Sequence, residues 1–390
     1  MSGPLTGIRV IELAHIMAGP VAGLMLSDMG ADVIKVEKPA GDDSRRMVPP
    51  TVEGESAAFL MMNRGKRGIV MDLKDADQLA TLRAMIRDAD VVIENYRKGT
   101  MEKLGLGYEA LSEANPGLVY LAISGFGRTG PYADRGGFDL IAQGMSGLMA
   151  ITGEGPGRAP VKCGAPVSDI TAGILGAMGV SAALASRAVT GRGQMVDTSL
   201  YEAAITHTYW QSAIAFATGV SPEAMGSAHP LNAPYEAFET AEGWITVGAA
   251  NQANWERLVE ALGRPDLAAD PRFATNADRM ANRPVLVAAL TAVFRTATAA
   301  EWLTRLEAAG LPAGPVNSIA EMHADPQTAA RAMVVETEHP VAGQTRAIGM
   351  PVKFSAPPPT PRPAPVLGQH TEEVLREAGV DPALIARITG

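Results

Sequence analysis

The chain has 390 residues, of which 47% are hydrophobic and 19% charged, so it can bury a large core and is not a disordered protein. Its length exceeds the roughly 250–300 residues at which one core stops growing, which favours two domains. The net charge of -9 argues against a general nucleic-acid-binding protein, and the single cysteine, Cys163, excludes an intrachain disulfide and a cysteine-cluster metal site.

The sequence shows no segment typical of export or of a membrane span. No positively charged leader precedes an apolar run at the start, and no stretch of about 18 uninterrupted apolar residues follows. The six histidines are scattered without metal-ligand spacing. We therefore expect a soluble cytoplasmic protein that binds no metal, no nucleic acid and no membrane.

The chain opens with the pattern of a β-α-β unit. Ile8–Leu13 and Ala31–Val36 are short apolar strands, and Gly19–Met29 between them is a helix with small residues on one side. This order predicts parallel strands with ligands beyond their carboxyl ends. An acidic residue, Glu37, lies about 20 positions after the first turn, but that turn lacks GxGxxG, which argues against NAD or FAD.

Three cations, Arg64, Lys66 and Arg67, fall within four residues just before an apolar strand. They have two interpretations, a solvated loop or an edge that contacts the phosphates of an anionic ligand. Further along, a helix is predicted over 77–88 and strands over 89–94 and 118–123. The loops after these strands converge on one rim, where a binding cleft is expected.

Asp169 is the one acidic residue between Val161 and Val180, at the entrance of an apolar helix rich in glycine and alanine. Its small residues allow another backbone or a ligand to come close. Asp169, like Ser168 before it, has the type of an N-cap residue. Alternatively, it is a carboxylate nucleophile or acid/base whose ionised form the helix dipole favours. The local sequence leaves both interpretations open.

The second half of the chain differs from the first in composition and in its pattern of predicted elements. A hairpin over 235–248 with its turn at 241–243, followed by three amphipathic helices, predicts a smaller α+β domain. A proline-rich stretch over 356–365 is expected to be an extended arm laid across the surface or across a partner subunit. The predicted division is a large domain over 1–205 and 330–390, a small domain over 225–320, and linkers over 206–224 and 321–329.

Six blocks of sequence, in order, resemble the family III CoA-transferases, the formyl-CoA and carnitine CoA-transferase group. They cover most of residues 3–204, and LGQHTEEVL near the end is a weaker match. The blocks are GPLTGIRVIELAHIMAGPVAGLMLSDMGADVIKVEKP, NRGKRGIVMDLK, DVVIENYRKGTMEKLGLGY, ISGFGRTGPYADRGGFDLIAQGMSGLM, PVKCGAPVSDITAGILGAM and TGRGQMVDTSLYEA.

The resemblance implies an α/β fold: a Rossmann-like large domain made from the N- and C-terminal parts, a smaller α+β domain, and two subunits interlocked as a homodimer. It also places the family's catalytic carboxylate on Asp169. The positions that it implies contact CoA are Met17, Ala18, Lys38, Met71, Asp72, Leu73, Lys74, Asn95, Tyr96, Arg97, Lys103, Gly136, Gly137 and Asp139. Lys38 and Lys103 stand where some members carry arginine, so the charge is kept without a bidentate phosphate contact.

The same fold includes the α-methylacyl-CoA racemases, which resemble this chain but use a histidine before an aspartate in one loop and a glutamate after the hairpin. At the matching places this chain has Phe138 before Asp139, and Asn251. Phenylalanine carries no proton, so transfer is favoured over a proton shift. Some transferases shield their intermediate with a run of glycines; the matching stretch here, 248–253, is GAANQA.

The implied reaction moves CoA from an acyl-CoA to a small carboxylic acid, with those two molecules as its partners and no permanently bound cofactor. Asp169, with a reference pKa of about 3.9, is expected to be ionised and to form an aspartyl-acyl anhydride and then an aspartyl-CoA thioester. The sequence as a whole is closest to members that use dicarboxylyl donors. Arg45, Arg46 and Arg135 have two interpretations, as partners of a second carboxylate or as surface or phosphate-binding residues, and the second is favoured. The alternatives are a 2-methylacyl-CoA racemase or epimerase and a non-catalytic CoA-binding protein.

Overall fold

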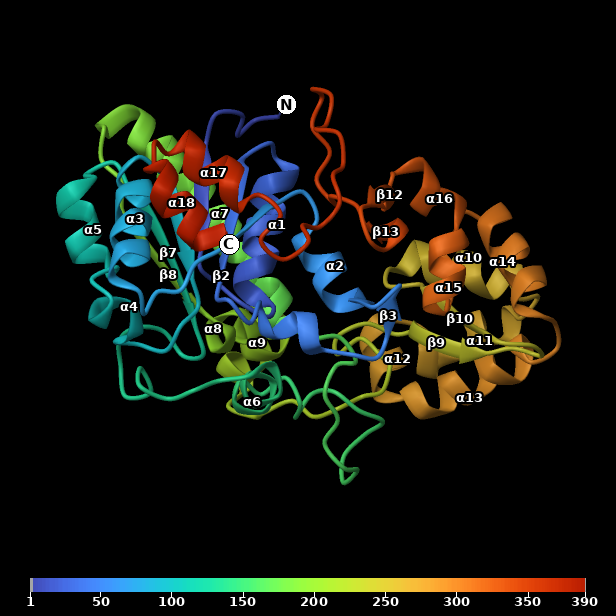
Figure 1. Ribbon diagram of the computed structural model, residues 1–390. Helices are drawn as coiled ribbons and strands as arrows, with labels where there is room; N and C mark the ends of the chain where they lie inside the picture. Colours follow the sequence, from blue (N-terminus) through green and yellow to red (C-terminus); the bar gives the residue numbers. More distant parts are fainter. Residues whose placement is uncertain (1–2, 390) are drawn as a thin grey trace. The chain divides into compact units, whose positions relative to one another are not determined.

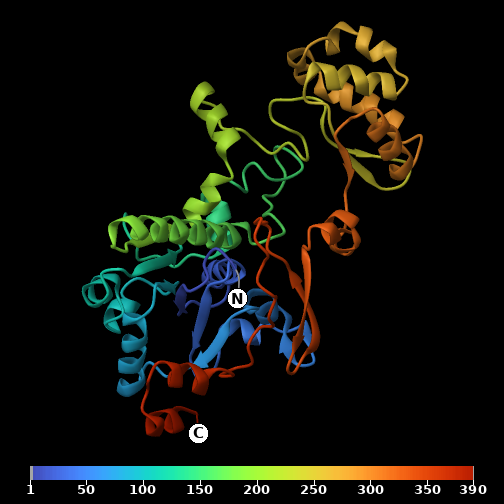
Figure 2. The same cartoon turned by 90° about the horizontal axis from the view of Figure 1, so that it is seen from above.

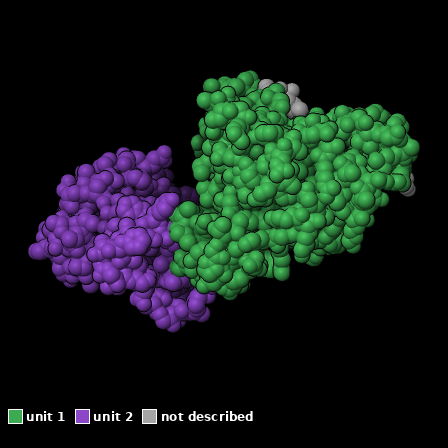
Figure 3. Space-filling view, turned by 90° about the vertical axis from the view of Figure 1, so that its left-hand side faces the viewer, with its two compact units in different colours: residues 1–148, 163–207, 326–390 green, residues 149–162, 208–325 purple. Residues whose placement is uncertain are grey.

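The computed structural model describes residues 3–389 and divides into two compact units. Unit 1 consists of residues 3–148, 163–207 and 326–389, and unit 2 of residues 149–162 and 208–325, as the two colours in Figure 3 show. The large unit is thus built from both ends of the chain. The domain limits predicted from composition stay a prediction, since the units are defined by contacts and not by independent folding.

Unit 1 is a mixed α/β fold built on a six-stranded, fully parallel sheet (Figure 1). The order across the sheet is β5-β2-β1-β6-β7-β8, with β1 in its interior. The strands are β1 (Arg9–Glu12), β2 (Asp32–Glu37), β5 (Arg67–Val70), β6 (Val91–Glu94), β7 (Val119–Ser124) and β8 (Met195–Ser199). Each predicted strand of the first half is present, with ends shifted by one or two residues.

Both faces of the sheet are covered, because residues along each strand alternate between two apolar clusters. On β1, Val10 belongs to the cluster shared with α1 and α7, and Ile11 to the cluster shared with α3 and α17. Figure 2 shows α7 on one side of the strands and the two C-terminal helices on the other. The helices of the first face are α1 (Ala18–Asp28), α6 (Asp139–Met145), α7 (Val167–Thr190) and α8 (Leu200–Thr206). Those of the second are α3 (Ala76–Arg87), α4 (Thr100–Lys103), α5 (Tyr108–Ala114), α17 (Thr371–Glu377) and α18 (Pro382–Thr389).

Helix α7 packs directly on α1 through its small residues. A Cβ built at Gly173 would lie 2.7 Å from the carbonyl oxygen of Ala18 and 2.7 Å from Cβ of Val21. Ala172, Gly176 and Ala177 on the same side are buried as well. By length and composition α7 is apolar enough to cross a membrane, but its apolar residues on this side cover the sheet and α1. The expected close backbone approach is confirmed.

The remaining elements of unit 1 lie around the sheet. The C-terminal end of the proline-rich stretch is extended and packs on α2, since buried Ala364 shares a small apolar cluster with Phe59, Leu60 and Ala342. The N–H of Gly65 also donates to the carbonyl oxygens of Arg362 and Pro363. These elements are η1 (Asp43–Arg46), β3 (Thr51–Val52), β4 (Glu55–Ser56), α2 (Ala57–Asn63), α16 (Pro326–Ala330), β12 (Val334–His339) and β13 (Gly343–Ile348).

Unit 2 is the expected α+β arrangement, and the predicted hairpin is present as β9 (Tyr235–Glu239) and β10 (Trp244–Gly248). A third strand, β11 (Ala313–Pro315), pairs with β10, and the core is formed by this sheet and the helices that cover it. The helices that contribute to this core are α10 (Gln252–Ala261), α11 (Pro265–Ala269), η2 (Pro271–Phe273), α12 (Asn276–Ala281), α13 (Arg283–Phe294) and α14 (Ala299–Ala308). Unit 2 also contains α9 (Tyr209–Thr218) and α15 (Ile319–Ala324), which bury no residue.

The stretch 248–253, which matches the glycine run of some transferases, is fastened at three points in unit 2. The N–H groups of Gly248 and Ala249 donate to the carbonyl oxygens of Pro312 and Pro234, both at 2.9 Å. Asn251 caps α10 by accepting from the N–H of Asn254 at 2.8 Å. Backbone bonds and a cap hold this segment in place, unlike a glycine-rich lid.

The close packing of α7 on α1 predicts that Gly173→Ala destabilises the protein. The added methyl group meets a backbone oxygen, so the helices must separate, which costs about 1–3 kcal/mol and outweighs the gain of about 1 kcal/mol in helix propensity. Thermal or urea unfolding measures the change. Gly164→Ala is the matched control, because a Cβ there has nothing within 4 Å; equal unfolding midpoints for both variants would contradict the packing argument.

Candidate active site

The candidate site lies where the connections of the large sheet diverge. Strand β1 is flanked by β2 and β6, and ligands of such sheets bind outside the carboxyl ends of the strands at this point. The loops that follow β1 and β6 are joined there: the N–H of His15 donates to Oδ1 of Asn95 at 2.9 Å, and Nδ2 of Asn95 donates to the carbonyl oxygen of His15 at 2.8 Å. A backbone of fixed position therefore borders the site.

A cavity of about 150 Å³ opens beside this pair of loops. Its walls come from the end of β7, from the loops that follow β1, β6 and β7, and from the beginnings of α1, α7 and α8. The lining residues are His15, Ile16, Met17, Ala18, Asn95, Ile123, Ser124, Gly125, Gly137, Phe138, Asp169 and Leu200. Asp169 is the only carboxylate among them.

Asp169 lies inside the first turn of α7, two residues after the helix begins at Val167. The N-cap is Pro166, which makes no side-chain capping bond, so the interpretation of Asp169 or Ser168 as an N-cap is wrong. The start of α7 is instead held by Asp139 on α6: Oδ1 of Asp139 accepts from the N–H of Ser168 at 2.9 Å. The other oxygen of Asp139 accepts from Nε2 of Gln143 at 2.7 Å. The Asp169 carboxylate is thereby left for the cavity.

Burial, followed by the nearby carboxylate of Asp139, raises the pKa of Asp169 to about 6. The sequence predicted the opposite direction, because a helix N-terminus favours the ionised form. Burial and a like charge outweigh the dipole here. Asp169 is still mostly ionised at neutral pH, and it is a stronger base than an ordinary aspartate.

A second cavity of about 120 Å³ adjoins the first. It is lined by Leu13, Ala14, His15, Val36, Glu37, Lys38, Gly41, Asp42, Asp43 and Tyr96. Nζ of Lys38 contacts Oδ1 of Asp43 at 2.8 Å, and this pair is exposed to solvent. His15 is the residue that borders both cavities.

The loop that carries His15 rests on a buried network of charges. Nζ of Lys35 contacts Oε1 of Glu12 at 3.1 Å, Oδ2 of Asp42 at 2.8 Å and the carbonyl oxygen of Ala14 at 2.9 Å. Asp42 in turn accepts from the N–H of Ile16 at 3.2 Å. Ile16 has a φ of 65°, a left-handed conformation that is strained for a β-branched residue, so the surroundings must hold it.

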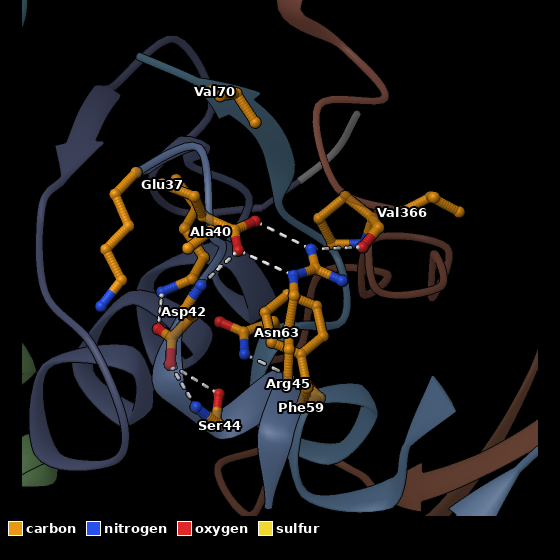
Figure 4. Close-up of polar contacts among 12 residues, drawn as sticks. Glu37, Ala40, Asp42, Ser44, Arg45, Phe59, Asn63, Val70 and Val366 are labelled. Atoms are coloured by element: carbon orange, nitrogen blue, oxygen red, sulfur yellow. Dashed lines mark hydrogen bonds and ion pairs between the residues drawn. The ribbon is translucent and has the colours of Figure 1, made fainter. Parts of the chain in front are cut away.

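The charges of this network stabilise one another. Burial opposes ionisation of Lys35 and Asp42, but their mutual attraction raises the pKa of Lys35 and lowers that of Asp42. Figure 4 shows the next layer, in which Asp42 accepts from Ser44 while Glu37 accepts from Arg45 and from the N–H of Asp42. Breaking any one of these contacts leaves a buried charge without its partner.

The structure gathers part of the predicted site. Met17, Ala18, Asn95, Gly137 and Asp169 line the first cavity, and Lys38 and Tyr96 line the second. Arg97 lies against Gly136, where a Cβ would be 3.3 Å from the guanidinium. Met71 is buried in the core, Leu73 packs against it, and Lys103 is exposed at the end of α4. Met71, Asp72, Leu73, Lys74 and Lys103 line neither cavity, and their contacts with CoA stay a prediction.

Both interpretations of the cation-rich segment are wrong. Arg64, Lys66 and Arg67 are buried, so they form neither a solvated loop nor a phosphate edge. Arg64 donates to Oδ2 of Asp28 at 2.7 Å, Lys66 contacts Oε2 of Glu12 at 2.8 Å, and Arg67 donates to Asp32 at 2.6 Å. Arg67 also reaches Glu373 and Glu377 of α17. These ion pairs join β5, the edge strand, and the residues just before it to α1, β1, β2 and α17.

The arginines named as candidate partners of a second carboxylate line neither cavity. Arg45 donates to both oxygens of Glu37 and lies over the ring of Phe59, 3.5 Å from its centre. Arg46 pairs with Asp43, and Arg135 lies over the ring of Tyr132. Among residues 3–389 no group of three or more histidine, cysteine, aspartate and glutamate side chains is placed to hold a metal ion.

Sequence reasoning missed His15, Ser124, Gly125 and Leu200 as cavity residues. Their common signal was position, since each directly follows or lies close behind a strand at the carboxyl edge of the sheet. For Gly125 and Gly137 the residue type was informative as well, because glycine allows close contact between backbones. A Cβ on Gly125 would lie 2.7 Å from the backbone of Gly137, so the two ends of the loop between β7 and α6 can meet only without side chains.

The whole chain matches known proteins. The model of "CoA-transferase family III" matches residues 5–371. The chain is 44% identical to a succinate–glutarate CoA-transferase of Agrobacterium fabrum, covering 96% of this chain and 95% of that protein. It is 40% identical to a succinyl-CoA:mesaconate CoA-transferase of Haloarcula marismortui, covering 97% of each. The crystal structure of a CAIB/BAIF family protein from Brucella suis superposes with a TM-score of 0.87 at 41% identity, covering 97% of this chain and 100% of that one.

The raised pKa of Asp169 predicts that Asp169→Asn stabilises the protein at neutral pH. In the unfolded chain the carboxyl ionises near pH 4 and in the folded protein near pH 6. The folded state therefore loses stability as the pH rises from about 4 to 6, and above that range the full penalty of about 3 kcal/mol remains. Urea unfolding at pH 7.5 and pH 4 tests this: Asp169→Asn should gain stability at the higher pH only.

Asp88→Asn is the control, because that carboxylate is exposed at the end of α3. A gain of equal size at both pH values, or none at pH 7.5, would show that the ionised form of Asp169 is not penalised in the folded protein.

Proposed function

The chain belongs to CoA-transferase family III and is a CoA-transferase, and from this we propose that it moves CoA from an acyl-CoA donor to a small dicarboxylic acid through Asp169. The relatives named above act on succinate, glutarate and mesaconate, which supports a dicarboxylic substrate. The observation that carries the proposal is the position of Asp169, the single carboxylate among the residues that line the cavity at the carboxyl ends of β1, β6 and β7.

The proposed reaction begins with attack by Asp169. An oxygen of its carboxylate bonds to the thioester carbon, the carbon–sulfur bond breaks, and the electron pair leaves on sulfur as CoA thiolate. The thiolate then attacks the aspartyl carbonyl of the mixed anhydride, which frees the donor acid and forms an aspartyl-CoA thioester. The acceptor carboxylate attacks that thioester, and the same steps in reverse deliver its CoA ester and restore Asp169.

Each addition places negative charge on a carbonyl oxygen, which requires hydrogen-bond donors. The side chains available for this in the cavity are few, so backbone N–H groups are the main source that we propose. Gly125 and Gly137 bring the two ends of the β7–α6 loop into contact at the cavity wall without side chains in the way. Their backbone is therefore accessible to a bound substrate.

The walls of the cavity suit the carbon chain of a dicarboxylic acid. Ile16, Met17, Ile123, Phe138 and Leu200 offer apolar surface to methylene groups. Phe138 is 74% exposed in this chain, and its ring is free to pack on a ligand. The site thus fits an acid with a short aliphatic spacer between its carboxylates.

Two observations weigh against a racemase. Phe138 occupies the place of a proton-carrying histidine, and the side-chain oxygen of Asn251 is occupied as the cap of α10. Neither position can supply the two bases that a proton shift across both faces of the α-carbon needs.

We also propose that two copies interlock as a homodimer. Helix α9 has no buried residue, and Phe216 at 89%, Tyr209 at 73% and Trp210 at 60% are exposed along it. Met178 and Val189 of α7 are exposed as well. Apolar surface of this extent is typical of a face that another chain covers, and the implied family architecture supplies a second copy.

Asp169→Ala is expected to abolish CoA transfer while leaving CoA binding intact, because it removes the nucleophile and little of the binding surface. Transfer is measured with succinyl-CoA as donor and glutarate or mesaconate as acceptor, and CoA binding by calorimetry. In the unmodified enzyme hydroxylamine should attack the activated aspartyl carbonyl, displace CoA or the donor acid and leave a hydroxamate on Asp169, visible by mass spectrometry of the peptide that contains it.

Cys163→Ser is the matched control near the same helix start, and it should retain activity because its thiol takes no part in the proposed steps. Transfer that persists in Asp169→Ala, or that stops in a folded Cys163→Ser protein, would refute the assignment of the nucleophile.

The proposed dimer predicts that Phe216→Asp weakens self-association, because it places a charge on the exposed face of α9. Light scattering coupled to size-exclusion chromatography should give the mass of two chains for the unmodified protein and a concentration-dependent loss of that mass for the variant. A monomeric unmodified protein would disprove the dimer. Glu223→Gln, a change outside α9, serves as the control.

A further inference from the structure

His15 is the residue that connects the two cavities, and the reaction proposed above gives it no role. Its side chain is half-buried, and it lines both the cavity of Asp169 and the cavity of Lys38. Within residues 3–389 its ring nitrogens make no hydrogen bond or ion pair, and its one close ring contact is with Tyr96 at 5.2 Å between centres. An imidazole with a free donor therefore stands at the passage.

The backbone that carries this imidazole is held by hydrogen bonds from two side chains. Asn95 binds both the N–H and the carbonyl group of His15, and Asp42 binds the N–H of Ile16. The left-handed backbone of Ile16 persists only because these contacts hold it. A backbone held by several hydrogen bonds around one residue is typical of a site in which that side chain must be positioned accurately.

A CoA thioester has two chemically different ends that fit the two cavities. Its thioester carbon must lie within contact distance of Asp169, and its phosphates need a cation. Among the residues that line the two cavities, Lys38 is the one lysine or arginine. The sulfur, bonded to the carbon that Asp169 attacks, and the arm behind it then pass the wall that His15 forms.

We propose that the imidazole of His15 donates its N–H to the sulfur of CoA and retains the thiolate between the two half-reactions. This rests on the transferase mechanism proposed above. When the carbon–sulfur bond breaks, the electron pair stays on sulfur and no proton is transferred. The hydrogen bond stabilises the anion and keeps it beside the anhydride until it attacks the aspartyl carbonyl.

The electrostatic surroundings suit a neutral donor. Burial lowers the pKa of His15, and the charges that face it, Asp42 and Asp43 against Lys35 and Lys38, offset one another. A neutral imidazole carries one N–H and does not form an ion pair that would tie up the Asp169 carboxylate. It also leaves the thiolate basic enough to react, as a full ion pair would not.

Two variants of similar size separate this role from packing. His15→Leu fills the same space without a donor, and His15→Gln keeps an N–H. The measurement is the pKa of the thiol of CoA bound to the enzyme, followed by the ultraviolet absorbance of the thiolate during a pH titration. A hydrogen bond to an anion is worth about 1.5–3 kcal/mol, so the pKa should rise by about one to two units in His15→Leu and much less in His15→Gln.

A second readout uses turnover. With an acyl-CoA donor and a dicarboxylic acceptor, a thiol reagent in solution should capture about tenfold more free CoA per transfer event with His15→Leu than with the unmodified enzyme. His323→Ala, an exposed histidine of α15, is the control and should change neither readout. Calorimetric CoA binding and thermal melting confirm that each variant is folded and loaded.

Equal thiol pKa values for the unmodified enzyme and His15→Leu, both binding CoA, would overturn the proposal, as would a loss of transfer without extra release of CoA. Failure of the transferase proposal gives a different result. In that case the unmodified enzyme transfers no CoA between any of the acids tested, while the thiol pKa still depends on residue 15.

Discussion

A buried set of four charges, Glu12, Lys35, Asp42 and Lys66, determines the geometry of the site. Burial alone would neutralise such groups, and it does lower the pKa of Lys66 to about 8. The set persists because each charge has a partner within 3.1 Å. Lys35 and Asp42 also bind backbone atoms of Ala14 and Ile16. The buried charges therefore fix the backbone of the loop that borders the cavity.

The fold could be read from the sequence because its strands are short apolar runs between amphipathic helices, and each run lies between two apolar layers. The catalytic position could be read by resemblance only, since a carboxylate in the first turn of a helix has the same local pattern as a cap. The functions of Arg64, Lys66 and Arg67 were misjudged for a clear reason. Their partners, Asp28, Glu12 and Asp32, lie between 30 and 60 positions away in the chain, and charge clusters reveal their partners only after folding.

His15 was passed over for a related reason. A lone histidine has no spacing to interpret, and its significance comes from two cavities that meet at its side chain. Asp169 shows the corresponding effect on reactivity. Its raised pKa makes it a better nucleophile than an exposed aspartate while leaving it largely charged at neutral pH. The surroundings thus tune one ordinary side chain by removing water and adding a second carboxylate.

Unit 1 is assembled from three separate stretches of chain, and the last of them contains α17 and α18, which cover one face of the sheet. During synthesis on the ribosome, the strands of residues 9–199 emerge long before these helices do, and the apolar face that Val374, Leu375 and Ile385 will cover stays open in the meantime. The intervening unit 2 can complete its own core while the large sheet waits. The segment that contains α17 and α18 therefore completes this face of the sheet last, and a chain that stops before it leaves apolar side chains of β1, β6 and β7 in contact with water.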